Sequence, residues 1–371
     1  MAVILHLSDI HRTPDEAVTN AQILNGLIAA LDDWIDAKRA PDIVVVSGDI
    51  TQAAEPQEYD EARAFLEGLL NHLKLDPTRL VLVPGNHDVY WPESEEALRT
   101  SMHMPTHCDH ELISKMDEVF FYPKSEEAYQ KRLDNFRTFY KSLIGTEYPR
   151  DRPKQVTTHI FDNFGLAFAG FNSCDVVDHI RFRPSIHSTA IYEASEALNT
   201  IIGTCIAVWH HDLDWRNEGH QDTLKHDCLQ QISQRVFRLA LCGHMHKPGG
   251  QNVQTLGGNP LPVITAGSLC AGPRQRTESV PRQFNIIEVD VDTARVHTRV
   301  KDEKSSPWRS DARYSSGDAY VPWFDVTLPR KRKDVRPIAA SRTTTDVNVK
   351  TPTPFGESMA SKMPREEVVL Q

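Results

Sequence analysis

Runs of apolar residues alternate along the chain with segments in which apolar positions recur at helical spacing. The runs are short and rich in β-branched side chains, which is typical of buried strands. They lie at residues 3–7, 43–46, 80–83, 205–209 and 236–242. The helical spacing is clearest from Ile23 to Ile35, downstream of a proline and a capping-box glutamate at Pro14 and Glu16. Further helices are predicted over 57–73, 126–144 and 223–235.

The second half of the chain adds strands with few helices between them. These strands are expected at residues 164–171, 261–266, 284–289 and 294–300. Strand–helix alternation followed by successive strands predicts an α/β fold, a four-layer αββα sandwich of two mixed sheets. Residues 92–150 carry helical signals and form a helical, cap-like insertion in this prediction.

The predicted catalytic domain spans residues 1–326. Residues 327–371 are rich in Thr, Ser, Pro and charge and poor in large apolar side chains. We expect this tail to be disordered, or to become ordered on an unknown protein partner.

Five polar islands follow the first set of apolar runs. They are Asp9-Ile10-His11, Gly48-Asp49, Gly85-Asn86-His87-Asp88, His210-His211 and Gly243-His244-Met245-His246. Because ligands of open α/β sheets bind beyond the carboxyl ends of the strands, we expect these islands to converge on one site.

The residue types in the islands indicate a metal site. Asp9 and His11 are two positions apart, so in an extended chain both side chains point to one side. Carboxylate, imidazole and amide donors without thiolate favour Mn, Fe, Zn, Co or Ni, and do not choose among them. Two divalent ions need a bridging ligand, and Asp49 is the best candidate because Gly48 lets the backbone approach closely.

The ordered islands resemble the pattern of the calcineurin-like metallophosphoesterase superfamily, D-x-H, G-D, G-N-H-[DE], H and G-H-x-H. The resemblance implies a first ion held by Asp9, His11, Asp49 and His246, and a second held by Asp49, Asn86, His210 and His244. It also implies that His87 is not a ligand but stabilises the transition state or protonates the leaving oxygen, and that Asp88 orients His87. In the superfamily the first histidine of a doublet is usually the ligand, which favours His210 over His211 and leaves the choice open.

The resemblance implies a phosphoesterase in which a metal-bridging hydroxide attacks phosphorus in line. Residues after Asp49 are Ile50-Thr51-Gln52, unlike the Asp-Arg-Gly of the protein phosphatases or the Tyr of the purple acid phosphatases. The remaining pattern is most similar to the cyclic-nucleotide phosphodiesterase branch, including Asn172-Ser173. We therefore expect a phosphodiesterase for nucleotide-type or other small phosphodiesters. A nuclease of the Mre11-like type is the alternative, ahead of a phosphomonoesterase or protein phosphatase and of a non-catalytic metal-bound scaffold.

The net charge and the cysteine content limit the possible binding partners and the cellular compartment. The formal net charge of −10 argues against a broad nucleic-acid or anionic-membrane face. Six scattered cysteines without a C-x-x-C pair indicate a reducing compartment. No apolar run reaches the ~20 residues of a membrane span, and a ligand candidate at Asp9 leaves no room for a signal peptide. A cytoplasmic location is expected.

Two weaker clusters remain. His103, His107, Cys108, Asp109 and His110 match no standard zinc spacing, and we interpret them as an exposed polar loop rather than a third metal site. A second stretch holds His179, Arg181 and Arg183, where an arginine would clamp a phosphate oxygen or simply be solvated.

Overall fold

The computed structural model describes residues 1–213, 222–245, 249–254, 258–270, 280–302, 306–316 and 319–330. Strand β1 (Ala2–Leu7) is buried on both faces. Its alternate residues Val3, Leu5 and Leu7 belong to one apolar core, whereas Ala2 and Ile4 belong to another. A strand with apolar neighbours on both sides has no polar face, which explains why its sequence is a nearly unbroken apolar run.

The first sheet has β1 near its centre. Its strand order is β15-β14-β13-β1-β2-β3, with β18 also paired to β14. The pairs β1–β2 and β2–β3 are parallel, while β13 and β14 join in antiparallel fashion. The strands beyond β1 are β2 (Ile43–Ser47), β3 (Leu80–Val83), β13 (Arg282–Val289), β14 (Thr293–Lys301), β15 (Arg309–Ser310) and β18 (Phe324–Thr327).

The second sheet is also mixed, with the strand order β11-β12-β10-β9-β8-β7. Its four central strands run parallel, and β7 and β11 are antiparallel edges. The strands are β7 (Val156–Phe161), β8 (Leu166–Phe171), β9 (Thr204–Val208), β10 (Phe237–Cys242), β11 (Gly249–Val253) and β12 (Leu261–Thr265). A separate hairpin pairs β16 (Tyr314–Ser316) with β17 (Ala319–Val321).

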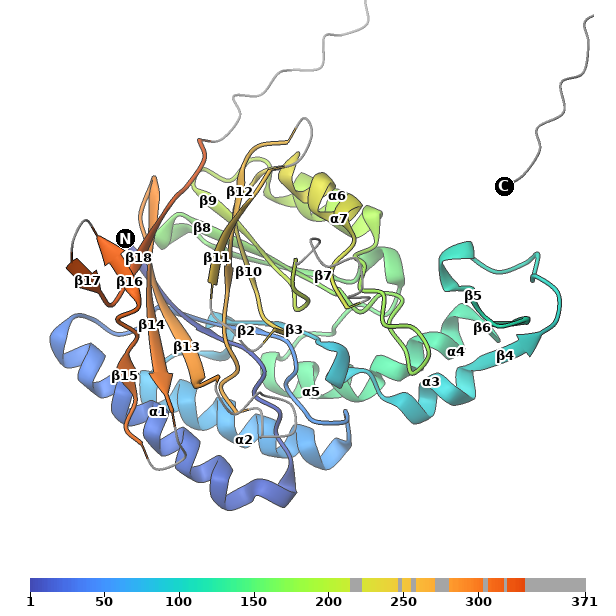
Figure 1. Cartoon of the computed structure of the whole chain (residues 1–371), viewed down its shortest axis with the longest axis horizontal. Coiled ribbons are helices and arrows are strands. Elements are labelled where there is room, and N and C mark those ends of the chain that lie inside the picture. The colour runs from blue at the N-terminus through green and yellow to red at the C-terminus, as the bar shows by residue number, and fades with distance from the viewer. Residues whose placement is uncertain are drawn as a thin grey trace, which may run out of the picture. The chain divides into compact units, whose positions relative to one another are not determined.

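The helices and sheets form four layers (Figure 1). In the described residues an apolar core lies between each pair of neighbouring layers. One core packs the first sheet against α1 (Ala17–Ala37), α2 (Pro56–Leu73) and α5 (Asp134–Ile144), and the second lies between the two sheets. A third packs the second sheet against α6 (Ser188–Leu198) and α7 (His226–Ser233). The predicted αββα sandwich of two mixed sheets is confirmed.

Residues 92–150 divide into two parts. The predicted helix over 126–144 is split into α4 (Glu126–Gln130) and α5 by a short 3₁₀ turn. Aromatic side chains of α5, among them Phe136, Phe139 and Tyr140, are buried in the core that also contains α2. This half of the segment is therefore part of the helical layer of the sandwich.

The other half forms a small arm. After α3 (Trp91–Ala97), strands β4 (Leu98–Ser101), β5 (Ser114–Met116) and β6 (Val119–Pro123) pair with one another in the order β4-β6-β5. Figure 1 shows this arm standing out beside the two sheets. The arm strands are not among the predicted ones. The sequences of β4 and β5 are short and mostly polar, whereas β6 contains the apolar run Val119-Phe120-Phe121-Tyr122, which the sequence analysis missed.

The end of the described chain extends the sandwich beyond residue 326. Thr327 pairs with Thr293 in the β14–β18 ladder, and Leu328 is buried in the core between the sheets. The expected start of the tail at residue 327 is therefore too early, because backbone pairing and an apolar side chain hold residues 327 and 328. Residues 331–371 lie outside the described residues. In the part of the chain that is described, we find no helix with the length and apolarity needed to cross a membrane.

Candidate metal centre

Polar loops follow five parallel strands, three from the first sheet and two from the second. Asp9, Asp49 and Asn86 come just after β1, β2 and β3, and His210 and His244 come just after β9 and β10. Backbone hydrogen bonds join the first two loops: Asp9 N donates to Gly48 O at 3.1 Å, and His11 N donates to Asp49 O at 3.0 Å. The strand ends thus bring together islands that are far apart in the sequence.

The backbone in these loops adopts the left-handed region, which side chains other than glycine seldom occupy. Asp9, His11, Asp49 and His244 have φ values of 54°, 37°, 50° and 76°. Such conformations cost free energy and are found where the surrounding structure holds functional groups in place.

Glycines clear the space around the centre. A Cβ atom on Gly85 would lie 2.2 Å from Asp49 Oδ1, and one on Gly48 would lie 2.6 Å from the His210 ring. A Cβ atom on Gly243 would lie 1.8 Å from Ser8 Oγ. These contacts are far inside van der Waals distance, so only glycine lets the ligand loops approach each other this closely.

One group of potential ligand atoms comes from His11, Asp49 and His87, all within 4.8 Å of one another. His11 Nε2 lies 3.7 Å from Asp49 Oδ2 and 3.9 Å from Asp9 Oδ1. The His11 and His87 rings meet edge to face with centroids 4.7 Å apart. His87 thus takes part in the same group as two of the predicted ligands, His11 and Asp49.

A second group comes from Asp49, His210 and His244, again within 4.8 Å. His210 Nε2 lies 3.2 Å from Asp49 Oδ2, from Asn86 Oδ1 and from His244 Nδ1. Asp49 is the residue common to both groups, which is the position that a bridging carboxylate requires.

The tautomer of His210 follows from its contact with the main chain. Its Nδ1 lies 2.8 Å from the carbonyl oxygen of Ser47. Since a carbonyl only accepts, Nδ1 carries a proton, and Nε2 is the ring atom that faces Asp49, Asn86 and His244 and that a metal ion would bind in place of a proton. Metal-binding histidines in proteins use the same arrangement, in which the second ring nitrogen donates to a carbonyl or carboxylate.

Electrostatics favour positive charge at this point. Burial alone would raise the pKa of the Asp49 carboxyl. The nearby His210 imidazole, with smaller contributions from His87 and His11, instead holds that pKa well below its usual range. Burial lowers the pKa of His210, but the Asp49 and Asp9 carboxylates overcome it and raise the value to about 9. Two carboxylates that favour a cation at His210 Nε2 provide the condition that a bound metal ion also meets.

His211, the second histidine of the doublet, is held by a contact with Ser173. It is fully buried, and its Nδ1 lies 2.8 Å from Ser173 Oγ, which also accepts a hydrogen bond from His210 N. In the described residues His211 belongs to neither group of potential ligands. The geometry therefore supports His210 as the ligand of the doublet, with Ser173 placing both histidines.

Asp88 does not take the expected position beside His87. Its buried carboxylate accepts hydrogen bonds from Ile50 N at 3.1 Å, Thr51 N at 3.2 Å and Gly85 N at 2.8 Å. His87 Nδ1 instead lies 2.6 Å from the carbonyl oxygen of Gln52. The prediction that Asp88 orients His87 directly is wrong, because backbone amides of two ligand loops occupy its carboxylate.

This use of Asp88 gives it a structural role in the centre. Burial, and then the nearby Asp49 carboxylate, raises the pKa of Asp88 to about 6, while the backbone hydrogen bonds oppose the rise. The carboxylate joins the loop after β3 to the loop after β2, and so fixes Asn86 relative to Asp49.

Two predicted ligands, Asp9 and His246, remain, and the structure describes only the first of them. Asp9 is buried, and its Oδ2 accepts a hydrogen bond from His244 N at 3.2 Å. His246, the last predicted ligand, lies outside the described residues. Asp222, which is not among the predicted site residues, has Oδ2 3.4 Å from His244 Nε2. Nothing in the local sequence of Asp222 distinguishes it from other acidic loop residues.

Arg181, which the sequence analysis considered as a phosphate clamp, already binds other side chains of the protein. Its guanidinium is buried against the Asp178 carboxylate and donates to the Tyr129 hydroxyl at 2.9 Å. It therefore braces the loop after β8 and does not serve as a phosphate clamp in this arrangement. Arg183 is exposed.

The donor set fits divalent metal ions. Imidazole nitrogens, carboxylate oxygens and the Asn86 carbonyl converge on Asp49, and glycines keep the approach open. Mixed nitrogen and oxygen donors without thiolate suit Mn, Fe, Zn, Co or Ni.

Comparisons with known proteins agree with this geometry. A profile of the family described as calcineurin-like phosphoesterase matches residues 2–248. An uncharacterized metallophosphoesterase-like protein, YydB of Bacillus subtilis (strain 168), is 20% identical over 78% of this chain and 56% of its own length. Glycerophosphodiester phosphodiesterase GpdQ of Enterobacter lignolyticus (strain SCF1) is 36% identical over 23% of this chain and 29% of its own length. The chain thus spans about half of the first relative and less of the second.

Solved structures are more distant. TT1561 of Thermus thermophilus is 12% identical, with a TM-score of 0.38 over 77% of this chain and 93% of that one. Vps29 of Chaetomium thermophilum is 10% identical, with a TM-score of 0.35 over 89% of this chain and 100% of that one.

Proposed function

Because the chain belongs to the calcineurin-like phosphoesterase family, in which hydrolysis with divalent metal ions is the general activity, we propose that it is a phosphodiesterase with two ions. The observation that carries the proposal is the position of Asp49 in both groups of converging ligand atoms. A carboxylate shared by two groups of potential ligand atoms supports a centre with two ions, because such ions need a bridging ligand.

Each side chain has a proposed task. Asp9, His11, Asp49 and His246 hold one ion, and Asp49, Asn86, His210 and His244 hold the other. When bound, the ions acidify a water and polarise the phosphoryl group of the substrate. Manganese or iron fits the donor set as well as zinc does.

His87 is the proposed proton donor to the leaving oxygen. Its Nδ1–H donates to the Gln52 carbonyl, which fixes the ring and directs Nε2 toward the centre. A positioned imidazole of this kind contributes roughly 10²–10⁴-fold to rates when it transfers a proton. A ring nitrogen of His87 lies within 4.8 Å of potential ligand atoms of His11 and Asp49, so metal binding by His87 is the competing role.

A small phosphodiester is the proposed substrate class. The relative GpdQ is named a glycerophosphodiester phosphodiesterase, and its short match to this chain supports a diester over a monoester. The net charge of −10 favours a small molecule over a nucleic acid. The six cysteines are scattered along the sequence without a C-x-x-C pair, which supports a reducing, cytoplasmic setting.

A hydrolysis panel with Mn²⁺ tests the proposal. It comprises bis-p-nitrophenyl phosphate, p-nitrophenyl phosphate, 2′,3′- and 3′,5′-cyclic nucleotides, single-stranded DNA and a phosphopeptide. We expect the diesters to be hydrolysed fastest, and small diesters faster than DNA.

The other outcomes are equally informative. If p-nitrophenyl phosphate or the phosphopeptide were hydrolysed fastest, the protein would be a phosphatase and not a phosphodiesterase. Preference for DNA would favour a nuclease. Metal binding without turnover of any substrate would indicate a scaffold and contradict the proposal.

A further inference from the structure

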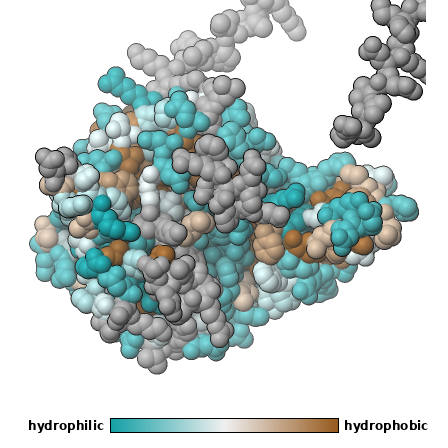
Figure 2. All heavy atoms as spheres, in the orientation of Figure 1, coloured by the Kyte–Doolittle hydropathy of each residue, from teal (hydrophilic) through white to brown (hydrophobic). Residues whose placement is uncertain are grey.

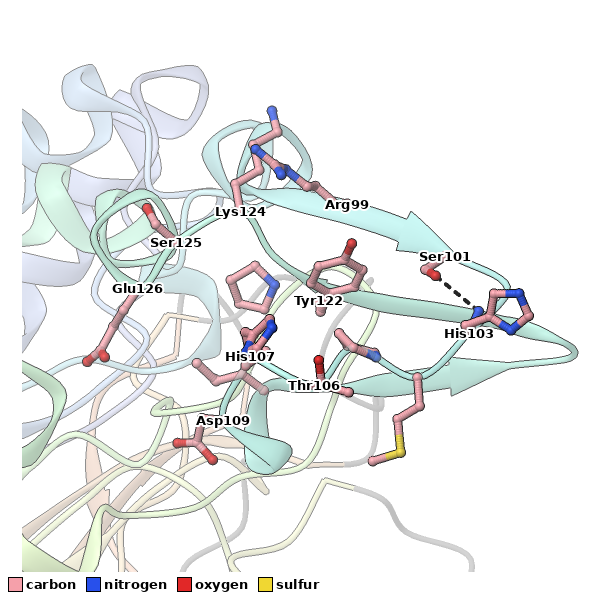
Figure 3. Close-up of a pocket in the computed structure, with 15 residues that line it drawn as sticks. Arg99, Ser101, His103, Thr106, His107, Asp109, Tyr122, Lys124, Ser125 and Glu126 are labelled. Carbon is pink, nitrogen blue, oxygen red and sulfur yellow. Dashed lines mark hydrogen bonds between the residues drawn. The ribbon is translucent and has the colours of Figure 1, made fainter.

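The arm contains a cavity of about 510 Å³ that is separate from the metal centre. It lies between β4, the loop that follows β4, the end of β6 and the start of α4, and none of the predicted metal ligands lines it (Figure 3). Its wall includes part of the polar cluster that matched no zinc pattern, His103, His107, Cys108 and Asp109. In the described residues these side chains do not form a group able to hold a metal ion.

Two cations stand together at one end of the cavity. Arg99 lies on β4, and Lys124 follows β6 and donates its backbone N–H to Ala97 O at 2.8 Å. Figure 3 shows the Arg99 and Lys124 side chains next to each other at this end. Both are exposed, and neither forms an ion pair with a carboxylate of the described residues. Adjacent like charges repel, and an anion placed between them relieves the repulsion.

The acidic wall at the other end is already neutralised in part. Asp109 Oδ2 accepts from Arg152 Nη1 at 2.8 Å, and Asp109 Oδ1 accepts from Glu111 N at 3.0 Å. The Arg152 guanidinium is buried and also forms hydrogen bonds of 2.8 and 2.7 Å to the two oxygens of Asp175. These contacts fix the wall to the body of the protein, so the cavity does not have to be ordered by a ligand.

The middle of the cavity is aromatic and apolar. Figure 3 shows the Tyr122 and His107 rings in the hollow between the two charged ends. Leu112 and Pro123, which also line the cavity, are buried. Figure 2 shows apolar and polar side chains side by side on the arm. A planar ring can stack on such side chains while a charged group attached to it reaches the cationic end.

We propose that the arm cavity binds a small organic phosphate that carries a planar ring, such as a nucleoside monophosphate. The phosphate lies against Arg99 and Lys124, and the ring lies between Tyr122 and His107. The volume of the cavity is within the range of roughly 300–1,000 Å³ that small-molecule sites occupy. This would be a second ligand site, independent of the hydrolysis proposed for the metal centre.

Calorimetric titration of the full-length protein with AMP tests the site. The Arg99→Ala/Lys124→Ala variant should bind AMP at least tenfold more weakly at the arm, while hydrolysis of bis-p-nitrophenyl phosphate stays at the wild-type rate. The matched control is Lys115→Ala/Lys131→Ala, which removes two exposed lysines of the same segment that do not line the cavity. Binding to the metal centre is common to all three proteins, so their difference reports the arm alone.

The proposal is overturned if wild type and the Arg99→Ala/Lys124→Ala variant bind AMP equally, or if the control loses as much affinity as that variant. Thermal melting of each variant checks folding, and Arg99→Lys, which keeps the charge, should retain most of the affinity. Titrations with inorganic phosphate and with adenosine measure the contributions of the phosphate and of the ring-bearing part of AMP separately. Both should bind more weakly than AMP, and Tyr122→Ala should weaken AMP but not inorganic phosphate. Equal binding of phosphate and AMP would contradict the ring position.

Discussion

The metal centre and the arm cavity both gather polar side chains, but they hold them in opposite ways. Asp49 and His210 are buried, the backbone at Asp49 adopts a strained left-handed conformation, and backbone amides fix the neighbouring Asp88. Arg99 and Lys124 are exposed on a small sheet of three short strands. The centre is thus preorganised by the fold of the whole sandwich, whereas the arm is a local addition. Changes in the centre should therefore have much larger effects on hydrolysis than changes in the arm.

Loss of Asp49 should have the largest effect. In the Asp49→Ala variant both groups of ligand atoms lose their common member, so we expect loss of both ions and no measurable diester hydrolysis. Asn86→Ala is the comparison variant, since it should weaken mainly one ion. Elemental analysis of the purified proteins measures the metal content, and two tightly held ions in Asp49→Ala would show that Asp49 is not the bridge.

Loss of His87 should have the next largest effect. If His87 donates a proton, His87→Ala keeps its metals and loses roughly 10²–10⁴-fold in rate. The loss should be smaller for nitrophenolate leaving groups, which hardly need protonation. Comparison of bis-p-nitrophenyl phosphate with an alkyl diester measures this, and a loss of metal in His87→Ala would assign His87 as a ligand instead.

Arg152 tests the junction between the two regions. Arg152→Ala leaves the buried Asp175 carboxylate without its partner, which typically costs about 3–5 kcal/mol of unfolding free energy. Urea unfolding monitored by circular dichroism measures this loss. Diester hydrolysis by the folded fraction should change little, because Arg152 touches none of the predicted ligands.

Lys154→Ala is the control for Arg152. Lys154 is exposed and pairs with Asp151 at 3.2 Å, and exposed pairs contribute only about 0–1 kcal/mol. Equal destabilisation by the two substitutions would show that the Arg152 network does not support the arm.

Removal of the arm should have the smallest effect on hydrolysis. Leu98 and Pro123 are paired across β4 and β6, so a short glycine linker can join them in place of residues 99–122. Because α5 and its buried aromatic residues remain, we expect intact metal binding and an unchanged rate with bis-p-nitrophenyl phosphate. AMP binding at the arm should disappear. Loss of diester hydrolysis in this variant would show that the arm is needed for catalysis, which would contradict the separate roles of the arm and the metal centre.

The same contrast explains which features can be predicted from the sequence. Strands buried on both faces leave long apolar runs, and polar residues directly after them mark strand ends, so Asp9, Asp49 and His210 can be found from their positions. The arm strands β4 and β5 are short and mostly polar, so they leave no such pattern, whereas the apolar run of β6 is detectable in the sequence. Helical spacing over 126–144 is detectable, but the packing of Phe136 against the sandwich depends on tertiary contacts.

Contacts between side chain and main chain are predictable only in part. The sequence places Asp88 beside His87, yet the backbone amides of Ile50 and Gly85 bind its carboxylate. The contact with Gly85 has capping-box spacing and can be found from the sequence, whereas the contact with Ile50 cannot, because Ile50 lies in the loop after a different strand.

The left-handed backbone at the centre has an evolutionary consequence. Asp9, His11, Asp49 and His244 each keep a conformation that costs roughly 1–2 kcal/mol for a residue with a Cβ atom, less for aspartate. Replacement of His11 or His244 by glycine would release this strain, so a library selected for heat resistance alone should accumulate such replacements. With the ligand roles proposed for His11 and His244, such heat-resistant variants would lose metal binding and hydrolysis, so the two histidines would be retained only under selection for activity.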